Sequence, residues 1–275
     1  MPKDNADQIE FWNGPTASNW VAAEERMDEL LAPITTAILQ AAAVSPGEAV
    51  LDVGCGCGAT SRAMAAVGAR VTGVDVSAPM LARARQRADD ESLSFIEADA
   101  QSHPFDPGFD LLFSRFGVMF FADPVAAFAN LRGALNPGGR LCFICWRAPA
   151  ENPWLSIGMA AAQPFLPPAE TPDPRAPGPF AFADPDYLAS VLADAGFEDV
   201  AITPHNPEMR LGADLTEAME FVTGVGPLSN VLKELAADLR EAALAAVREA
   251  LAPFAGPSGV LLGGACWIAQ GRRGA

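Results

Sequence analysis

A glycine-rich stretch is the first group of residues whose spacing could support chemistry. The sequence "LDVGCGCGAT" at 51–60 places Gly54, Gly56 and Gly58 at alternate positions, directly after an apolar run that contains Asp52. Glycines between a strand and a helix let a ligand approach the main chain, and the first turn of the helix offers free N–H groups. Such a loop is a weak signal by itself, because it also occurs as a tight turn without a ligand.

Two further acids strengthen that signal. Asp75 ends the next apolar run, close to the offset of roughly 20 residues at which an acid reaches a ribose hydroxyl. Asp99 ends the third run, in "EADA". One loop and two acids at adjacent strand ends predict an adenosine site, with the main chain beside the ligand's linking portion, Asp75 on the ribose hydroxyls and Asp99 near the adenine amino group.

The elements that position these residues alternate between strand-like and helical patterns. Short runs rich in apolar and β-branched residues are typical of buried strands, and they occupy 49–54, 69–76, 92–99, 109–116, 139–146, 197–202 and 259–272. Helical spacing occurs at 60–67, 78–90 and 124–135, with Ser77 and Asp123 placed as caps. The pattern predicts an α/β fold with a seven-stranded, mostly parallel sheet and helices on both faces.

Three segments lie outside this alternation. Residues 8–45 have a helical pattern interrupted at Pro33, which predicts an N-terminal helical arm over 1–45 before a main domain at 46–275. Prolines predict an irregular insertion at about 148–184, and a helical pattern predicts a second insertion at about 214–252. We expect residues 227–252 of the second insertion to form one amphipathic helix that packs on the sheet edge. We expect 8–30 and 148–184 to cover the carboxyl edge of the sheet as a lid.

Five segments in order resemble the successive motifs of a known family. "VLDVGCGCG", "VTGVDVS", "EADA", "FDLLFSRFGVMFF" and "LNPGGRLCFICW" resemble those of the class I S-adenosylmethionine-dependent methyltransferases, in the branch similar to the ubiquinone and menaquinone C-methyltransferases. The resemblance is close over about 45–146. It implies a Rossmann-like sheet of order 3-2-1-4-5-7-6 with an antiparallel seventh strand, and transfer of a methyl group from S-adenosylmethionine to a small molecule.

The resemblance also implies which residues bind the cofactor. Asp52, Gly54 and Gly56 flank its methionine part, Asp75 holds the ribose, and Asp99 and Ala100 hold adenine. The full set of implied cofactor-binding residues is Asp52, Gly54, Cys55, Gly56, Asp75, Val76, Met80, Asp99, Ala100, Ser114, Arg115 and Phe116, of which the last three border the sulfonium.

Two other functions remain open at the level of sequence. A nicotinamide or flavin protein has the pattern G-x-G-x-x-G, whereas the third glycine here, Gly58, comes one residue early, which favours the methyl donor. A non-catalytic regulator or scaffold that binds S-adenosylmethionine would carry the same motifs.

Acceptor and catalytic groups are less defined than the cofactor site. Seven residues outside the motif glycines and acids could converge above the methyl group and favour an apolar or aromatic acceptor: Trp12, Trp20, Met119, Phe120, Trp146, Arg147 and Trp154. The only histidines are His103 and His205, and His205, which lies among prolines, is expected in an exposed loop. His103 and Arg115 are weak catalytic candidates: a structural role is the plainer interpretation of His103, and Arg115 could equally form a structural ion pair. A charged methyl donor needs positioning more than a base.

Composition excludes several other functions. The formal net charge is −16, and no cluster of basic residues is denser than "RARQR" at 83–87, so nucleic acid is not an expected partner. No stretch approaches the roughly 20 apolar residues of a membrane span, and we expect a cytoplasmic protein. Cys142 and Cys145 would point to opposite faces of a strand, so no metal site is expected. The oligomeric state is undetermined.

Overall fold

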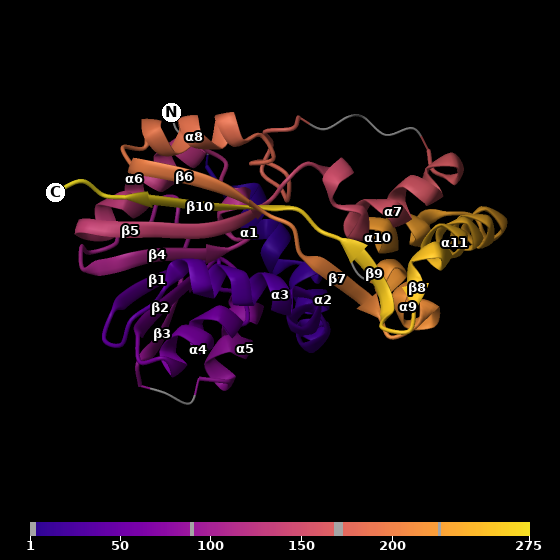
Figure 1. The fold of residues 1–275 in the computed structure, drawn as a ribbon, viewed down its shortest axis with the longest axis horizontal. Helices are drawn as coiled ribbons and strands as arrows, with labels where there is room; N and C mark the ends of the chain where they lie inside the picture. The colour runs from indigo at the N-terminus through magenta and orange to yellow at the C-terminus, as the bar shows by residue number, and fades with distance from the viewer. Residues whose placement is uncertain (1–3, 89–90, 168–172, 225–226) are drawn as a thin grey trace. The chain divides into compact units, whose positions relative to one another are not determined.

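The computed structural model describes residues 4–88, 91–167, 173–224 and 227–275. The chain divides into two compact units (Figure 1). Unit 1 consists of Met1–Arg147, Pro174–His205 and Cys266–Ala275, and unit 2 consists of Ala148–Asp173 and Asn206–Ala265. The expected helix at 78–90 and the expected irregular insertion at 148–184 each run partly outside the described residues, at 89–90 and 168–172.

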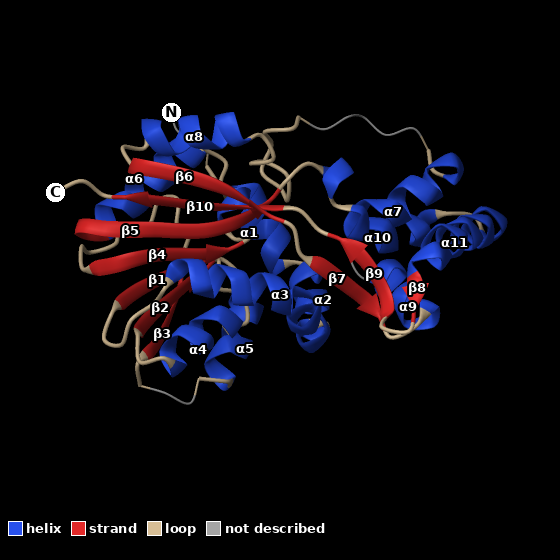
Figure 2. Ribbon diagram, viewed as in Figure 1, coloured by secondary structure: helices blue, strands red, loops and turns tan. Residues whose placement is uncertain are grey.

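Unit 1 is built on one sheet. Within the described residues this sheet has seven strands in the order β3-β2-β1-β4-β5-β10-β6, as Figure 2 shows in red. The strands are β1 (Ala49–Val53), β2 (Arg70–Asp75), β3 (Leu93–Glu97), β4 (Phe109–Arg115), β5 (Leu135–Trp146), β6 (Glu198–His205) and β10 (Cys266–Arg272). All neighbours pair in parallel except β10, which is antiparallel to both β5 and β6. The predicted Rossmann-like order with its antiparallel last strand is therefore confirmed.

Helices cover both faces of this sheet. They are α1 (Ala6–Asn13), α2 (Pro15–Ala22), α3 (Glu24–Ala42), α4 (Ala59–Ala66), α5 (Ala78–Gln86), α6 (Pro124–Ala134) and α8 (Pro185–Asp194). Figure 1 shows α3, α4 and α5 on one side, and α6 and α8 on the other. Asp123 caps α6 as predicted, because its side chain accepts the Ala126 N–H at 3.0 Å. Ser77 precedes α5 but makes no capping hydrogen bond with its side chain.

The core of unit 1 is apolar and rich in phenylalanine. Strands β1 and β4 are buried almost throughout, which explains why their sequences are continuous apolar runs rather than alternating ones. Phe128 on α6 lies at the centre of a ring cluster, with ring centroids 5.5 Å from Phe143, 6.0 Å from Phe182 and 6.4 Å from Phe197. This cluster packs α6 against β5 in the core of unit 1.

The N-terminal arm is helical, but the predicted interruption at Pro33 is wrong. Pro33 lies inside α3, where buried Leu30, Ile34 and Ile38 hold the helix against the rest of unit 1 despite the lost N–H. The arm breaks instead at Gly14, which is extended (φ −84°, ψ −161°) because the following Pro15 disfavours a helical residue before it.

Unit 2 contains a small sheet and helices. Its described residues form a three-stranded antiparallel sheet of order β7-β9-β8, from β7 (Glu208–Gly212), β8 (Ala255–Gly256) and β9 (Gly259–Gly263). Its helices are α7 (Pro153–Ala162), α9 (Leu215–Gly224), α10 (Pro227–Glu234) and α11 (Ala237–Leu251). The expectation that 148–184 is irregular is therefore wrong over α7, where Pro153 occupies the first helical position, which tolerates proline.

Two other element predictions are corrected in the C-terminal region. The strand expected at 259–272 is two strands in two sheets, because Gly264 and Ala265 leave the ladder: the Gly264 N–H donates to the Pro207 carbonyl, and Asn152 pairs with both main-chain groups of Ala265. The single helix expected at 227–252 is α10 and α11, and α11 packs mainly on α7 of the same unit.

Candidate functional site

The glycine loop connects β1 to α4 at the carboxyl edge of the large sheet. Gly54, Gly56 and Gly58 have φ values of +68°, +54° and +77°, a region that residues with a Cβ avoid. A Cβ on Gly54 would lie 2.5 Å from Cα of Gly117, so the loop after β1 and the loop after β4 are in backbone contact. This loop therefore needs glycine for its own conformation and for a close approach by a neighbouring segment.

Asp75, the last residue of β2, is fixed by the glycine loop. Its Oδ2 accepts the Gly56 N–H at 2.8 Å and its Oδ1 accepts the Ser77 N–H at 2.8 Å. Burial raises the pKa of this carboxyl, and these backbone hydrogen bonds oppose the rise. Each carboxylate oxygen accepts more than one hydrogen bond, so Asp75 keeps acceptor capacity for two hydroxyl groups.

Asp99 follows β3 and is held by a residue from the N-terminal arm. Its Oδ1 accepts from Asn5 Nδ2 at 3.2 Å and from the Gln101 N–H at 3.0 Å. Its Oδ2 accepts from the Ser102 hydroxyl at 3.2 Å. Asp75 and Asp99 thus stand at the ends of adjacent strands, as the sequence predicts.

Asp52 near the end of β1 is completely buried. Its Oδ2 accepts from the hydroxyls of Thr60 and Ser61 at 2.8 and 2.6 Å, whereas its Oδ1 has no hydrogen-bond partner among the described residues. Burial raises its pKa to about 6, against the two hydroxyl contacts that lower it. A buried acceptor of this kind fits a donor group of a bound molecule.

The residues that end β4 have structural partners. Ser114 donates its hydroxyl to the Val53 carbonyl at 2.8 Å and accepts the Gly117 N–H at 3.1 Å. Arg115 donates to Thr35 at 2.6 Å and lies 3.4 Å from Asp28, both on α3, which is the structural ion pair considered from the sequence. Gly117 was not identified from the sequence, although it follows Phe116 directly; its role depends on contact with Gly54.

Phe116 has an unusual backbone. Its φ is +68°, which is rare for a bulky residue, and its ring stacks on Trp146 at 4.2 Å between centroids with the planes 9° apart. Strained residues of this kind concentrate at functional sites. Phe116 and Trp146 come from the carboxyl ends of β4 and β5. Their place beside the reacting group stays a prediction.

A second aromatic group comes from the arm and from the segment after β4. Trp12 lies at its centre, with ring centroids 6.1 Å from Trp20, 5.2 Å from Phe120 and 5.3 Å from Phe11. The structure thus brings together three of the residues predicted for the pocket. Trp154 belongs to unit 2, where it is buried and its indole N–H donates to Asn152 at 3.2 Å.

The other predicted site residues are distributed as follows. Cys55 and Ala100 are buried in the loops after β1 and β3, Met80 on α5 lies next to Gly56, and Met119 is buried after β4. The Val76 carbonyl accepts from Asn13 at 2.8 Å, and Cζ of Arg147 lies 4.5 Å from the centroid of the Trp267 ring.

Burial raises the pKa of the Cys55 thiol, so this thiol is a poor nucleophile.

Neither histidine has a geometry that marks it as a base. His103 packs its ring against Phe105 at 4.7 Å between centroids. His205 was expected in an exposed loop, but it is the last residue of β6, pairs with Cys266 across the ladder, and has a buried Nε2. That expectation is wrong because Pro204 does not end the strand.

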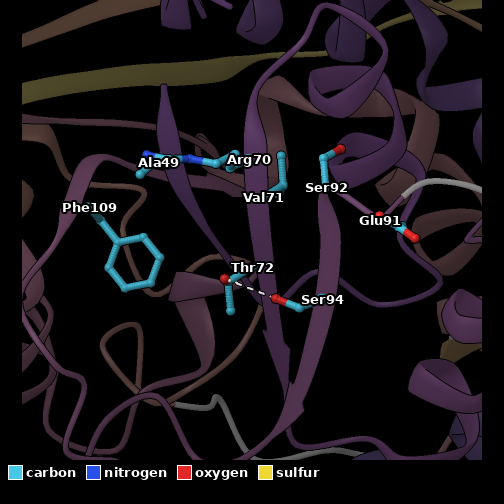
Figure 3. A pocket seen from close by; sticks show the side chains of 8 residues that line it. All are labelled: Ala49, Arg70, Val71, Thr72, Glu91, Ser92, Ser94 and Phe109. Carbon is cyan, nitrogen blue, oxygen red and sulfur yellow. Dashed lines mark hydrogen bonds between the residues drawn. The ribbon is translucent and has the colours of Figure 1, made fainter. Parts of the chain in front are cut away.

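A separate pocket lies at the opposite edge of the sheet. Figure 3 shows that it is lined by residues at the amino ends of β1 to β4, including Ala49, Arg70 and Phe109. Its only hydrogen bond drawn joins the hydroxyls of Thr72 and Ser94, 3.1 Å apart. Ligands of open α/β sheets bind at the carboxyl edge, so this pocket is not the candidate site.

Comparisons with known proteins show which proteins this chain resembles. Residues 51–143 match the family model described as "Methyltransferase domain". An uncharacterized protein of Mycobacterium tuberculosis is 38% identical over 122 residues, which cover 43% of this chain and 44% of that protein. The match therefore spans less than half the length of that mycobacterial relative.

A longer match and a solved structure extend the comparison. Demethylmenaquinone methyltransferase of Clavibacter sepedonicus is 35% identical over 171 residues, which cover 58% of this chain and 69% of that enzyme. The structure of Haemonchus contortus phosphoethanolamine N-methyltransferase 2 with S-adenosyl-L-methionine has a TM-score of 0.54 at 18% identity, covering 88% of this chain and 52% of that one. At that identity the structural likeness shows the fold alone.

The sheet order, the glycine loop and the acids at adjacent strand ends are those of a Rossmann-like protein. With the matches above, the chain belongs to the class I S-adenosylmethionine-dependent methyltransferases, in the branch of the menaquinone methyltransferases.

Proposed function

We propose that this chain transfers a methyl group from S-adenosylmethionine to a small planar aromatic acceptor in the cytoplasm. The observation that carries the proposal is the row of three acids, Asp52, Asp75 and Asp99, at the carboxyl ends of adjacent strands beside a loop of left-handed glycines. The dinucleotide-binding pattern includes one acid, which binds the ribose. The additional buried acid on β1, Asp52, therefore favours the methyl donor.

The residues present fit S-adenosylmethionine group by group. Asp52 Oδ1, which lacks a hydrogen-bond partner in the described ranges, suits the positively charged amino group of the methionine part. Asp75 has acceptor capacity for the two ribose hydroxyls, and Asp99 for the adenine amino group. The bare main chain of Gly54 and Gly56 leaves room for the portion that links them.

The chemistry that this cofactor supplies is an electrophilic methyl group on a sulfonium, which a nucleophilic acceptor takes by in-line displacement, leaving S-adenosylhomocysteine. The protein's own part is then to hold the acceptor in line and to exclude water. Phe116 and Trp146, stacked at the ends of β4 and β5, form an apolar wall suited to that task. Arg115 is already engaged with α3, so it serves the fold rather than the reaction.

An aromatic acceptor is supported by two observations. Flat rings of Trp12, Trp20 and Phe120 come together in unit 1, and such surfaces favour planar ligands. The relative from Clavibacter sepedonicus is named for demethylmenaquinone. We therefore propose a ring compound of this general type, methylated at carbon or oxygen.

Calorimetry tests the cofactor assignment. We expect binding of S-adenosylmethionine and S-adenosylhomocysteine but not of NAD, and Asp75→Ala should weaken S-adenosylhomocysteine binding by about 1.5 to 3 kcal/mol, because two hydroxyls lose a charged acceptor. Glu97→Ala is the matched control, since Glu97 pairs with Asp75 across the β2–β3 ladder but is exposed. Tight NAD binding, or equal affinities of the two variants, would contradict the proposal.

A further inference from the structure

Several buried polar atoms near the carboxyl edge of the large sheet have no hydrogen-bond partner within the part of the chain that the structure describes. Besides Asp52 Oδ1, they include Asn5 Oδ1, Gln8 Oε1 and Ser77 Oγ. Three of these four atoms are pure acceptors, whereas a buried acceptor is normally paired. A ligand that binds here must therefore bring hydrogen-bond donors.

Asn5 has the most informative geometry of this group. Its side chain is 7% exposed, and its Nδ2 donates to Asp99 Oδ1 at 3.2 Å. Its donor side is thus directed at the acid that follows β3, and its Oδ1, on the same carboxamide, is buried without a partner. Asn5 Oδ1 and the Asp99 carboxylate are therefore neighbouring acceptors, because a single hydrogen bond joins the two side chains.

The position of Asn5 is fixed because α1 is attached at both ends. At the other end of the helix, Asn13 Nδ2 donates to the Val76 carbonyl at 2.8 Å and Asn13 Oδ1 accepts the Ala78 N–H at 3.0 Å. Helix α1 is therefore held to Asp99 through Asn5 at one end, and to the loop after β2 through Asn13 at the other end. It crosses the same strand ends that carry Asp99 and Asp75.

We propose that Asn5 is an adenine-specificity residue supplied by the N-terminal helix. An exocyclic amino group carries two hydrogens, so one can go to Asp99 and the other to Asn5 Oδ1. This arrangement selects a 6-aminopurine over a purine that lacks the amino group. The inference rests on the proposed function, because it presupposes an adenosine cofactor.

The test compares two ligands in three proteins by calorimetry. The ligands are S-adenosylhomocysteine and its analogue with hydrogen in place of the 6-amino group, and the proteins are the full chain, Asn5→Ala and Asn13→Ala. Asn5→Ala should weaken S-adenosylhomocysteine binding about fivefold to tenfold, the loss of one hydrogen bond, and leave the affinity for the analogue within about twofold. Asn13→Ala loosens α1 without removing an acceptor near Asp99, so it should weaken both ligands by the same factor.

The outcomes separate this inference from the proposed function. If the unaltered chain binds neither ligand, the proposed function fails and the inference with it. If the unaltered chain binds S-adenosylhomocysteine but Asn5→Ala weakens both ligands equally, Asn5 only positions α1 and the inference alone is overturned. Melting temperatures of the three proteins without ligand check that each is folded, and Asn5→Ser provides a second variant with the same expected pattern.

Discussion

At the scale of single residues, Asp52 links the site to stability. Its folded pKa of about 6 lies above the ordinary 3.8, so the folded protein holds a proton that the unfolded chain has already lost between these values. The associated stability is fully present below pH 3.8 and is lost as pH rises through 6. Between pH 4.5 and 8 the unfolding free energy should therefore fall by about 2 kcal/mol relative to Asp52→Asn, measured by urea unfolding without ligand.

The Asp52→Asn variant provides the reference, because it keeps the shape of the side chain and removes the proton-binding group at this position. A difference between them that is constant over this range would show that Asp52 keeps an ordinary pKa. The result matters for function, because the ionised Asp52 side chain destabilises the fold at neutral pH and also has one oxygen available to a ligand.

At the scale of elements, the sequence predicts what depends on local pattern. Buried parallel strands need apolar runs, and Pro124 and Asp123 mark the start of α6, so these elements could be predicted. The docking of α1 could not, because it depends on amide side chains meeting acceptors far along the chain, such as Asn5 with Asp99 and Asn13 with Val76. The same holds for Gly117, where glycine is needed because Gly54, in the loop after β1, lies against it.

One such long-range contact joins α3 to α5. Glu24, which is 5% exposed, lies 2.7 Å from Arg83 and also pairs with Arg87. Burial alone would raise the pKa of Glu24, but the two guanidinium groups together lower it, so the ionised pair stabilises the fold above pH 4.5 and less at lower pH. Glu24→Gln should reduce the unfolding free energy at pH 7 by about 1 to 2 kcal/mol, since both arginines are partly solvated.

Glu25→Gln is the matched control, because Glu25 is the next residue on the same helix and is exposed. Equal melting temperatures for the two variants at pH 7 would refute a stabilising role for the α3–α5 pair.

At the scale of the whole molecule, the candidate cofactor-binding residues belong to one of the two compact units. Asn5, Asp52, Asp75 and Asp99 all belong to unit 1. Within the described residues, no helix is both long and apolar enough to cross a membrane. Ala148–Asp173 and Asn206–Ala265 are separate in sequence but form unit 2 together. The sequence pattern of neither segment indicates this, because it depends on contacts such as that of α11 with α7.

Unit 1 should bind the cofactor by itself. His205 and Cys266 face each other in the β6–β10 ladder, so a two-residue Asn-Gly turn can replace 206–265 as a β-hairpin connection. A Gly/Ser linker of equal length can replace 148–173. Helix α7 lies within this segment, and without the rest of unit 2 its apolar residues would be exposed, so it is replaced as well. This shortened protein should bind S-adenosylhomocysteine within about threefold of the full chain in calorimetry, because a compact unit with its own core keeps its site. A shortened protein with a cooperative melting transition and no binding would show instead that unit 2 contributes to the cofactor site.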